Sequence, residues 1–297
     1  MQHKAGFVNI VGNPNVGKST LMNALVGEQI SIITSKAQTT RHRIMGIVNG
    51  EDFQIVYSDT PGVLKPNYKL QESMRGFSNS ALTDADILLY VTDVFDSSEK
   101  NKDFLDKVSQ TDVATILIIN KIDLINENKL IELVDFWKKR LPKAEILPIS
   151  AIEKFNIEAL LKRIKELLPF SPPFFDKDSL TDRPERFFVT EIIREKILLN
   201  YEKEVPYSVE VAVEEFKEEE DIIRISAIIF CERDSQKGIL IGKGGKSLRK
   251  VGIEARKDIE LFFNKKIFLQ LFVKVEKDWR NREQKLRSFG YQLEHKN

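Results

Sequence analysis

The sequence contains very little cysteine and histidine. A single cysteine, Cys231, stands among 297 residues, so no disulfide can form within the chain. The three histidines, His3, His42 and His295, do not have the spacing of a metal-binding motif. These absences exclude a disulfide-stabilised scaffold and argue against a structural zinc site, and they favour a reducing environment such as the cytoplasm.

Long hydrophobic runs are also missing. No stretch approaches the roughly 20 consecutive apolar residues that a membrane-spanning helix needs, and the first residues, MQHKAGFVNIVG, do not have the pattern of a secretory signal. The composition, with 42% hydrophobic and 31% charged residues, is typical of a globular protein, and the length allows about two domains. We therefore expect a cytoplasmic protein, for which any contact with the cell membrane is peripheral.

The total charge of the chain is nearly neutral, but acidic and basic residues are unevenly distributed along the sequence. The 46 basic and 45 acidic residues give a formal net charge of +1. Residues 201–234 carry 11 acidic and 4 basic side chains, a net charge of −7, whereas residues 235–297 carry 16 basic and 7 acidic ones, a net charge of +9. This basic segment suggests a region that binds a polyanion, although a lysine-rich helix face is often no more than solvated surface.

Residues 1–170 predict an α/β domain with a mostly parallel sheet and helices on both faces. Short hydrophobic runs, typical of strands buried on both faces, alternate with helical patterns such as residues 128–140 and 156–168. The predicted strands are residues 7–11, 53–57, 87–92, 114–119 and 145–149. The proline-rich segment 171–185 then predicts an extended linker.

Residues 186–297 predict a smaller α+β domain. A helix at about residues 186–201 precedes two strands and a short helix that ends at a glycine-rich loop. A longer helix over residues 246–263, a strand at 266–275 and a basic helix near the end of the chain follow. The resulting order, α-β-β-α-α-β, places the glycine-rich loop between the two central helices.

The sequence GNPNVGKS at residues 12–19 matches the phosphate-binding pattern G-x-x-x-x-G-K-[ST] and directly follows the first predicted strand. In such a loop, backbone N–H groups face phosphate oxygens, Lys18 reaches the β- and γ-phosphates, and Ser19 binds Mg²⁺. By itself, the pattern does not distinguish ATP from GTP. The predicted nucleotide contacts in this region are Gly12, Asn13, Asn15, Val16, Gly17, Lys18, Ser19 and Thr20.

The sequence DTPG at residues 59–62 predicts a second contact with the phosphates. Here the Asp59 carboxylate can meet Mg²⁺ through water and the Gly62 N–H can meet the γ-phosphate. The polar segment between the two motifs is either a simple surface loop or a switch that supplies Thr40, or Thr39 as the weaker candidate, to Mg²⁺. The expected catalytic residues are Lys18, Thr40 and Gly62, and the expected Mg²⁺ ligands are Ser19, Thr40 and Asp59.

The sequence NKID, which begins at Asn120, predicts the choice of base. A carboxylate at Asp123 can accept hydrogen bonds from N1–H and the exocyclic amine of guanine, a pattern that adenine does not offer, so we expect GTP. Lys121 can lie along the base, and Asn120 can tie this loop to the phosphate loop. A backbone N–H near guanine O6 is expected from Ser150, Ala151 and Ile152. The motifs follow one another at strand ends, where open α/β sheets bind their ligands.

Two residues bear on the rate of hydrolysis. Val63 follows DTPG, where Ras-like proteins have a glutamine that orients the attacking water, so we expect slow intrinsic hydrolysis. Asn15 resembles the asparagine of potassium-activated GTPases. It either holds a monovalent cation such as K⁺ or only stabilises the loop.

The sequence GKGG, which begins at Gly242, fits the GxxG loop that clamps about four nucleotides of single-stranded RNA. The alternative is an ordinary turn between helices with a solvated basic face. Ile239, Leu240, Ile241 and Val251 favour core positions over contacts with bases, and Cys231 is expected to be buried. The predicted RNA contacts are Ile241, Gly242, Lys243, Gly244, Gly245, Lys246, Arg249 and Lys250.

Together, GNPNVGKS, QTTR, DTPG, NKID and SAIE, followed by ILIGKGGKSLRKVG, resemble the Era family of bacterial GTPases over essentially the whole chain. The resemblance implies a Ras-like G domain and a type II KH domain that binds the 3′ end of 16S ribosomal RNA. It further implies a role in small-subunit assembly and rRNA maturation, with Mg²⁺ as cofactor and a monomeric protein. Ala37 departs from the pattern, because proline is expected before QTTR.

A different class of function remains open at this point. The basic C-terminal domain of a GTPase can also dock on an anionic membrane or on a protein partner, since basic helices are attracted to acidic lipids. The GxxG loop separates the two hypotheses, because lipid docking does not need it.

Overall fold

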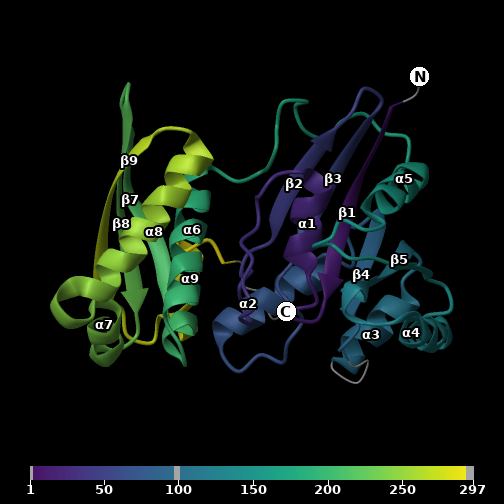
Figure 1. Ribbon diagram of the computed structural model, residues 1–297, viewed down its shortest axis with the longest axis horizontal. Helices are drawn as coiled ribbons and strands as arrows, with labels where there is room; N and C mark the ends of the chain where they lie inside the picture. Colours follow the sequence, from purple (N-terminus) through teal and green to yellow (C-terminus); the bar gives the residue numbers. More distant parts are fainter. Residues whose placement is uncertain (1–2, 97–100, 292–297) are drawn as a thin grey trace. The chain divides into compact units, whose positions relative to one another are not determined.

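The computed structural model describes residues 3–96 and 101–291, which form two compact units (Figure 1). The first unit extends to Asp182 and the second begins at Arg183, except that the short segment Tyr68–Leu70 groups with the second. Each unit is described by itself below.

The first unit is built on a six-stranded sheet in the order β2-β3-β1-β4-β5-β6. Neighbouring strands are parallel except β2 and β3, which are antiparallel. The strands are β1 (Lys4–Gly12), β2 (Ile44–Asn49), β3 (Phe53–Asp59), β4 (Ile87–Asp93), β5 (Ala114–Asn120) and β6 (Glu145–Pro148). Every residue of β4 is buried, and side chains alternate between the faces of a strand, so the sheet is covered on both faces. This confirms the predicted α/β class.

Five helices accompany this sheet: α1 (Lys18–Val26), α2 (Lys69–Ser80), α3 (Lys102–Gln110), α4 (Glu127–Arg140) and α5 (Ile157–Leu167). Helix α1 lies against β1, β2 and β3, and it also contacts α5. Helices α3 and α4 share a hydrophobic cluster with β4 and β5, in which the buried Trp137 packs 6.0 Å from the ring of Tyr90. Helix α4 starts where the Asn126 side chain accepts a hydrogen bond from the backbone N–H of Lys129.

The carboxyl ends of the parallel strands meet at one edge of the sheet. The register pairs Ile10 with Asp59 between β1 and β3, and Asp93 with Asn120 between β4 and β5. The loops that follow these strands therefore lie side by side, and three of the predicted nucleotide motifs belong to them.

The proline-rich segment after α5 is extended and lies against the first unit. The backbone N–H of Ile47 in β2 donates to the carbonyl of Leu180, and the side chain of Gln54 in β3 donates to the carbonyl of Phe175, both at 2.8 Å. These bonds hold the segment on the sheet edge up to the point where the second unit begins.

The second unit combines a three-stranded sheet, in the order β7-β8-β9, with helices on one face. Strands β7 and β8 are antiparallel, and β8 and β9 are parallel. Its elements are α6 (Glu185–Asn200), the 3₁₀ turn η2 (Val205–Tyr207), β7 (Glu210–Glu218), β8 (Ile222–Cys231), α7 (Asp234–Ile241), α8 (Lys246–Phe263) and β9 (Lys266–Val275). The α-β-β-α-α-β order is the predicted one. Cys231 is fully buried in this core, as expected.

The basic helix expected at the end of the chain is interrupted. A 3₁₀ turn, η4 (Trp279–Asn281), precedes α9 (Glu283–Ser288), which has six residues. The indole of Trp279 is fully buried and donates a hydrogen bond to the carbonyl of Ser208 at 2.9 Å, and Leu286 is also buried. The break lies at Arg282, whose backbone is extended, with φ −92° and ψ 110°. Among the described residues, no helix is both long and apolar enough to cross a membrane.

Candidate nucleotide site and candidate RNA-binding loop

The phosphate loop joins β1 to α1 and depends on glycine at two positions. Gly12 has a φ of +149° and Gly17 a φ of +96°. A Cβ atom at Gly12 would lie 2.1 Å from the carbonyl oxygen of Val91, and one at Gly17 would lie 2.2 Å from the side-chain amide of Asn120. The loop can therefore approach the neighbouring strands only because these side chains are absent.

Lys18 is buried at the first position of α1. Its ammonium donates hydrogen bonds to the carbonyls of Gly12 at 3.2 Å and of Asn13 at 2.8 Å. Burial lowers the pKa of the Lys18 side chain to about 8, although the nearby Asp59 and Asp96 carboxylates counteract the effect. A phosphate bound beside this ammonium would stabilise its charged form.

Three oxygen-bearing side chains from separate segments meet beside Lys18. The Ser19 hydroxyl donates to Asp59 Oδ2 at 2.7 Å and lies 2.9 Å from the Thr40 hydroxyl, which is 3.4 Å from the same carboxylate oxygen. Burial raises the pKa of Asp59, and Lys18 together with the two hydroxyl groups opposes this rise. Hydroxyl and carboxylate oxygens are suitable ligands for Mg²⁺, so this group fits the metal expected there.

Thr39, the weaker candidate, lies differently. Its hydroxyl donates to the carbonyl of Lys36 and is also bonded to the Thr34 hydroxyl, both at 2.6 Å. In this structure the loop therefore directs Thr40, and not Thr39, to Ser19 and Asp59.

The DTPG segment is packed closely on the phosphate loop. A Cβ atom at Gly62 would come within 2.7 Å of the backbone of Pro14, and the backbone N–H of Val63 donates to the carbonyl of Gly12 at 3.1 Å. The Val63 side chain is 5% exposed and belongs to the core cluster. It is thus an apolar anchor and offers no polar group to a water molecule.

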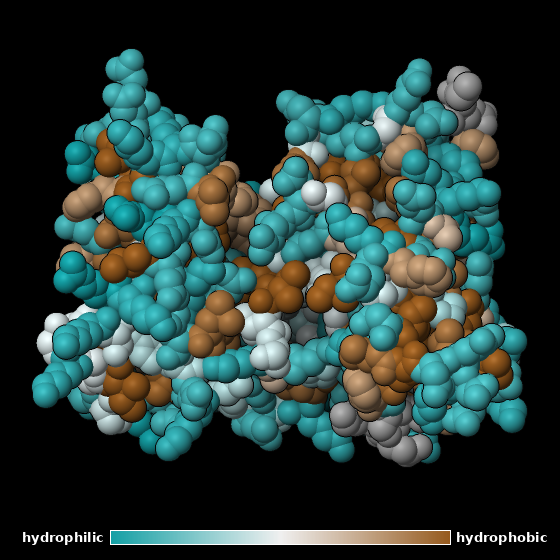
Figure 2. Space-filling model, viewed as in Figure 1, coloured by the Kyte–Doolittle hydropathy of each residue, from teal (hydrophilic) through white to brown (hydrophobic). Residues whose placement is uncertain are grey.

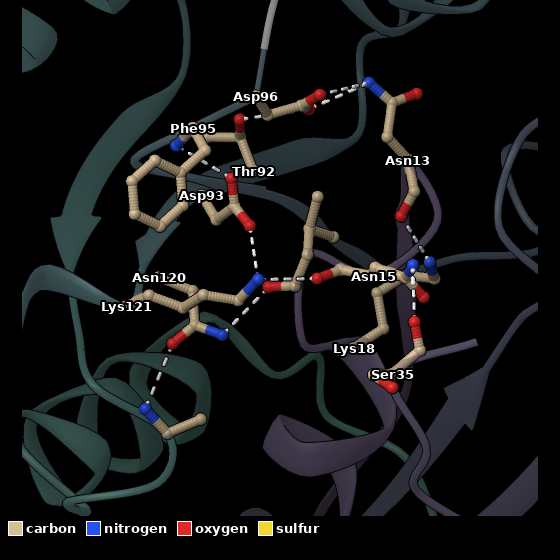
Figure 3. A network of polar contacts seen from close by, with 12 residues as sticks. Asn13, Asn15, Lys18, Ser35, Thr92, Asp93, Phe95, Asp96, Asn120 and Lys121 are labelled. Atoms are coloured by element: carbon tan, nitrogen blue, oxygen red, sulfur yellow. Dashed lines mark hydrogen bonds and ion pairs between the residues drawn. The ribbon is translucent and has the colours of Figure 1, made fainter. Parts of the chain in front are cut away.

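The NKID loop is tied to the phosphate loop and to the segment after β6. The Asn120 side chain donates to the carbonyl of Val16 at 2.9 Å and accepts from the backbone N–H of Ala151 at 3.0 Å (Figure 3). Ser150 is buried, whereas Ile152 is exposed. Asp123, in the 3₁₀ turn η1 (Ile122–Leu124), is exposed, so its carboxylate is accessible to a ligand.

The residues of the separate motifs surround one hollow with a volume of about 330 Å³. Those among the predicted site residues that line it are Asn15, Gly17, Lys18, Ser19, Thr20, Thr40, Gly62 and Lys121. The phosphate loop, the segment that carries Thr40, and Lys121 of the NKID sequence therefore line the same hollow. The predicted base contacts Asp123, Ser150, Ala151 and Ile152 are not among its lining residues.

Several residues of this region were not predicted from sequence. Asp93, at the end of β4, accepts a hydrogen bond from the ammonium of Lys121 at 2.5 Å, and the same ammonium donates to the carbonyl of Asn15 at 2.6 Å (Figure 3). Asp96 accepts from the Asn13 side chain at 2.8 Å and 3.0 Å. The position of Asp93 at the carboxyl end of a central strand is a signal that sequence analysis alone could have used.

Asn15, the candidate K⁺ ligand, has a left-handed backbone with a φ of 65°. Its side-chain amide donates to the carbonyl of Ser35 at 3.1 Å (Figure 3). This contact links the phosphate loop to the switch segment, and the side-chain oxygen is the atom through which Asn15 would bind a cation.

The glycine-rich loop of the second unit forms a 3₁₀ turn, η3 (Lys243–Gly245), between α7 and α8. Gly244 and Gly245 have φ angles of +61° and +76°, and a Cβ atom at either position would meet nothing within 4 Å. The backbone of this loop is therefore open to close approach by a ligand. Lys243, Lys246, Arg249 and Lys250 are all exposed.

The hydrophobic residues beside the loop are divided between core and surface. Leu240 and Val251 are fully buried, as expected, and Ile241 is half-buried. Ile239 is 50% exposed, so its predicted core position is wrong. Helix α7 buries Leu240, the next residue, and its turn of about 100° per residue directs Ile239 outward. Figure 2 shows hydrophobic residues at the surface over α7.

Two protein-family models match this chain in the two units. Residues 7–121 match a family described as 50S ribosome-binding GTPase, and residues 204–280 match the KH domain. The matches follow one another in the order of the observed folds.

Curated relatives match nearly the full length. GTPase Era of Alkaliphilus metalliredigens is 44% identical, covering 98% of this chain and 100% of its own, and GTPase Era of Ruminiclostridium cellulolyticum is 42% identical, covering 98% of both chains.

Two solved Era structures are similar over 98% of this chain and 100% of their own, each at 38% identity. One is a complex with MgGDPNP and nucleotides 1506–1542 of 16S ribosomal RNA, with a TM-score of 0.94. The other is an Aquifex aeolicus Era variant bound to GDP and AlF₄⁻, with a TM-score of 0.93. The chain has a G domain followed by a KH domain, and it is 42–44% identical to curated Era proteins over 98% of its length. It therefore belongs to the GTPase Era family.

Proposed function

We propose that this protein is a GTP-hydrolysing switch whose KH domain binds the 3′ end of 16S ribosomal RNA and assists small-subunit assembly and rRNA maturation. The proposal of GTP hydrolysis rests on one observation. The side chains of Ser19, Thr40 and Asp59 lie within hydrogen-bond distance of one another beside the buried Lys18. These groups are the ones that a Mg²⁺-bound nucleoside triphosphate needs.

Each of these side chains has a different role in hydrolysis. Bound Mg²⁺ would be held by Ser19 and Thr40, with Asp59 acting through water, and would neutralise charge on the phosphates. Lys18 stabilises charge on the β- and γ-phosphates, and the Gly62 N–H orients the γ-phosphate. Because Val63 offers no polar group to the attacking water, the protein itself hydrolyses GTP slowly.

Guanine selection rests on the loop after β5. Asp123 is exposed and free to accept hydrogen bonds from the base, while Asn120 fixes the loop at a set distance from the phosphate loop. A backbone N–H from the segment Ser150, Ala151 and Ile152 would complete the base site. In this structure the N–H of Ser150 donates to Phe155 and that of Ala151 to Asn120. A K⁺ ion bound through Asn15 would add positive charge near the phosphates.

RNA binding rests on the open glycine loop and its four exposed cations. The similar Era structure that contains 16S ribosomal RNA nucleotides 1506–1542 supports this RNA as the ligand. The fully buried Leu286 and Trp279 argue against the membrane alternative, because the C-terminal basic segment turns its apolar residues into the core instead of toward lipid.

The test compares nucleotides and RNAs on the purified full chain. Phosphate release is measured with GTP and with ATP, in Mg²⁺ and after chelation, and binding is measured with the 1506–1542 fragment and with a shuffled sequence of equal length. We expect release from GTP only, its loss on chelation, and tighter binding of the native fragment. Equal turnover of ATP, or equal affinity for the shuffled RNA, would contradict the proposal.

A further inference from the structure

Another hollow in the first unit has four basic side chains in its lining. It has a volume of about 440 Å³ and lies between the segment that follows DTPG, the carboxyl half of α2 and the beginning of α3. Its charged lining residues are Lys65, Arg75, Lys102, Asp103 and Lys107. We refer to it as the basic hollow.

Among the described residues, the cations of the basic hollow have no acidic partner. All four are exposed, and within residues 3–96 and 101–291 none of them forms an ion pair. The Lys107 ammonium donates to the side-chain oxygen of Asn79 at 3.3 Å, which leaves its charge uncompensated. With Asp103 as the single lining carboxylate, the hollow carries an excess of three positive charges and favours an anionic ligand.

The wall of the basic hollow is bonded directly to the phosphate loop. Val63 lines the hollow, its N–H donates to the carbonyl of Gly12 at 3.1 Å, and its carbonyl accepts from the side chain of Asn101 at 2.7 Å. The same Asn101 amide donates to the side-chain oxygen of Asn13 at 2.8 Å. A ligand in the hollow therefore lies beside Val63, the residue next to Gly62, and beside Asn101, which is bonded to the phosphate loop.

We propose that the basic hollow binds phosphates of the ribosomal RNA backbone and so gives the G domain an RNA contact of its own, separate from the GxxG loop. This inference rests on the proposed function, because it needs the small-subunit RNA as the partner. It places an RNA contact directly after the DTPG motif.

The lining favours RNA over an acidic protein segment. Protein partners commonly anchor aromatic or aliphatic side chains in apolar pockets. Among the hydrophobic lining residues, Val63 and Phe104 are 5% and 7% exposed, and Leu64 and Pro66 are half-buried. The most exposed side chains of the lining are therefore the charged ones, and the apolar ones offer less surface to such an anchor. Separate lysine and arginine side chains on three segments suit successive backbone phosphates, which need charge and no apolar pocket.

Charge reversal on α3 tests the proposal. Full-length protein with Lys102→Glu and Lys107→Glu is compared with a Lys138→Glu and Lys139→Glu control, which makes the same change at two exposed positions on α4. Binding to purified small ribosomal subunits is measured at several salt concentrations. We expect at least tenfold weaker binding for the α3 variant, with a salt slope smaller by about 0.7 for each lost phosphate contact, and wild-type behaviour for the control.

Site-directed crosslinking identifies the occupant. Because Cys231 is fully buried, a Lys102→Cys variant carries one accessible thiol for a photoreactive group, and Lys138→Cys is the matched control. Crosslinks from position 102 to 16S ribosomal RNA, and none from position 138, would support the proposal. Crosslinks from position 102 to ribosomal protein alone, or no crosslinks, would overturn it.

A GxxG variant, Lys243→Asp with Gly244→Asp, separates this inference from the proposed function. If that variant loses subunit binding while the α3 variant binds like the wild type, the basic hollow does not contact RNA, although the proposed function stands. If the wild type does not bind the subunit at all, both proposals fail. Folding is checked by GTP affinity without RNA, which we expect to be unchanged in the α3 variant.

Discussion

The side-chain amide of Asn120 donates a hydrogen bond to the carbonyl oxygen of Val16 at 2.9 Å. This bond joins the loop after β5 to the loop after β1, and the Asn120 oxygen at the same time accepts from Ala151. One buried side chain thereby fixes the spacing of three loops, so the distance between the base-binding and phosphate-binding regions is set before a nucleotide binds.

Replacement of Asp123 by Asn should change the preferred base. The carboxylate accepts two hydrogen bonds from guanine, whereas an amide can donate to the carbonyl that xanthine carries in place of the exocyclic amine. We expect preference to shift from GTP toward xanthosine triphosphate in competition binding. Because Asp123 is exposed, the fold should be unaffected. An unchanged preference for guanine would show that NKID does not read the base.

Replacement of Lys18 by Ala should remove the buried positive charge beside the phosphates. We expect a loss on the order of 100-fold in single-turnover hydrolysis, as is typical when a preorganised charged contact is deleted. RNA binding by the same full-length variant is the internal control and should persist. Normal hydrolysis by this variant would refute the assignment of the phosphate loop.

Nucleotide affinity should depend on pH because the pKa of Lys18 is lowered to about 8 by burial. The free protein loses this proton as the pH rises through that value, and bound phosphate favours its return, so affinity falls at higher pH. Between pH 7.5 and 8.5 we expect a decrease of about threefold. Calorimetry in two buffers with different ionisation enthalpies should show proton uptake on binding, and Lys18→Ala should show none from this group.

If Asn15 binds a cation during hydrolysis, GTP turnover should be faster in potassium than in sodium at equal ionic strength. Asn15→Ala should remove the difference, with a smaller effect on nucleotide affinity. This substitution also removes the hydrogen bond to Ser35, so the wild type in the two salts is the decisive comparison. Equal rates would eliminate the cation and leave the GTPase assignment intact.

Much of the fold could be predicted because its signals are local. The continuous hydrophobic run of β4 and the period of α8 depend on neighbouring residues, and the GxxG loop has its own glycine pattern. The C-terminal segment was predicted less well. Its lysines and arginines favour a helix, but the backbone is extended at Arg282. The segment is held by a contact between Trp279 and Ser208, which are 71 positions apart.

In the candidate site, too, residues in local motifs could be predicted from the sequence and residues placed by long-range contacts could not. Contiguous motifs identified Lys18, Asp59 and Asn120, because each motif provides several contacts at a fixed spacing. Asp93 and Asn101 belong to no motif, and their roles arise only when strand order brings β4 and α3 beside the phosphate loop. Their contacts are set by the tertiary structure, although the position of Asp93 at the end of β4 is a signal that the sequence contains.

The central claim, that the GxxG loop binds ribosomal RNA separately from the nucleotide site, is tested most directly by one variant. Lys243→Asp with Gly244→Asp places carboxylates where the backbone is open and a polyanion must approach. Binding of the 16S ribosomal RNA 3′ end and of GTP is measured on the same full-length protein. We predict that RNA binding collapses while GTP affinity stays normal. Retained RNA affinity at moderate salt would contradict the account.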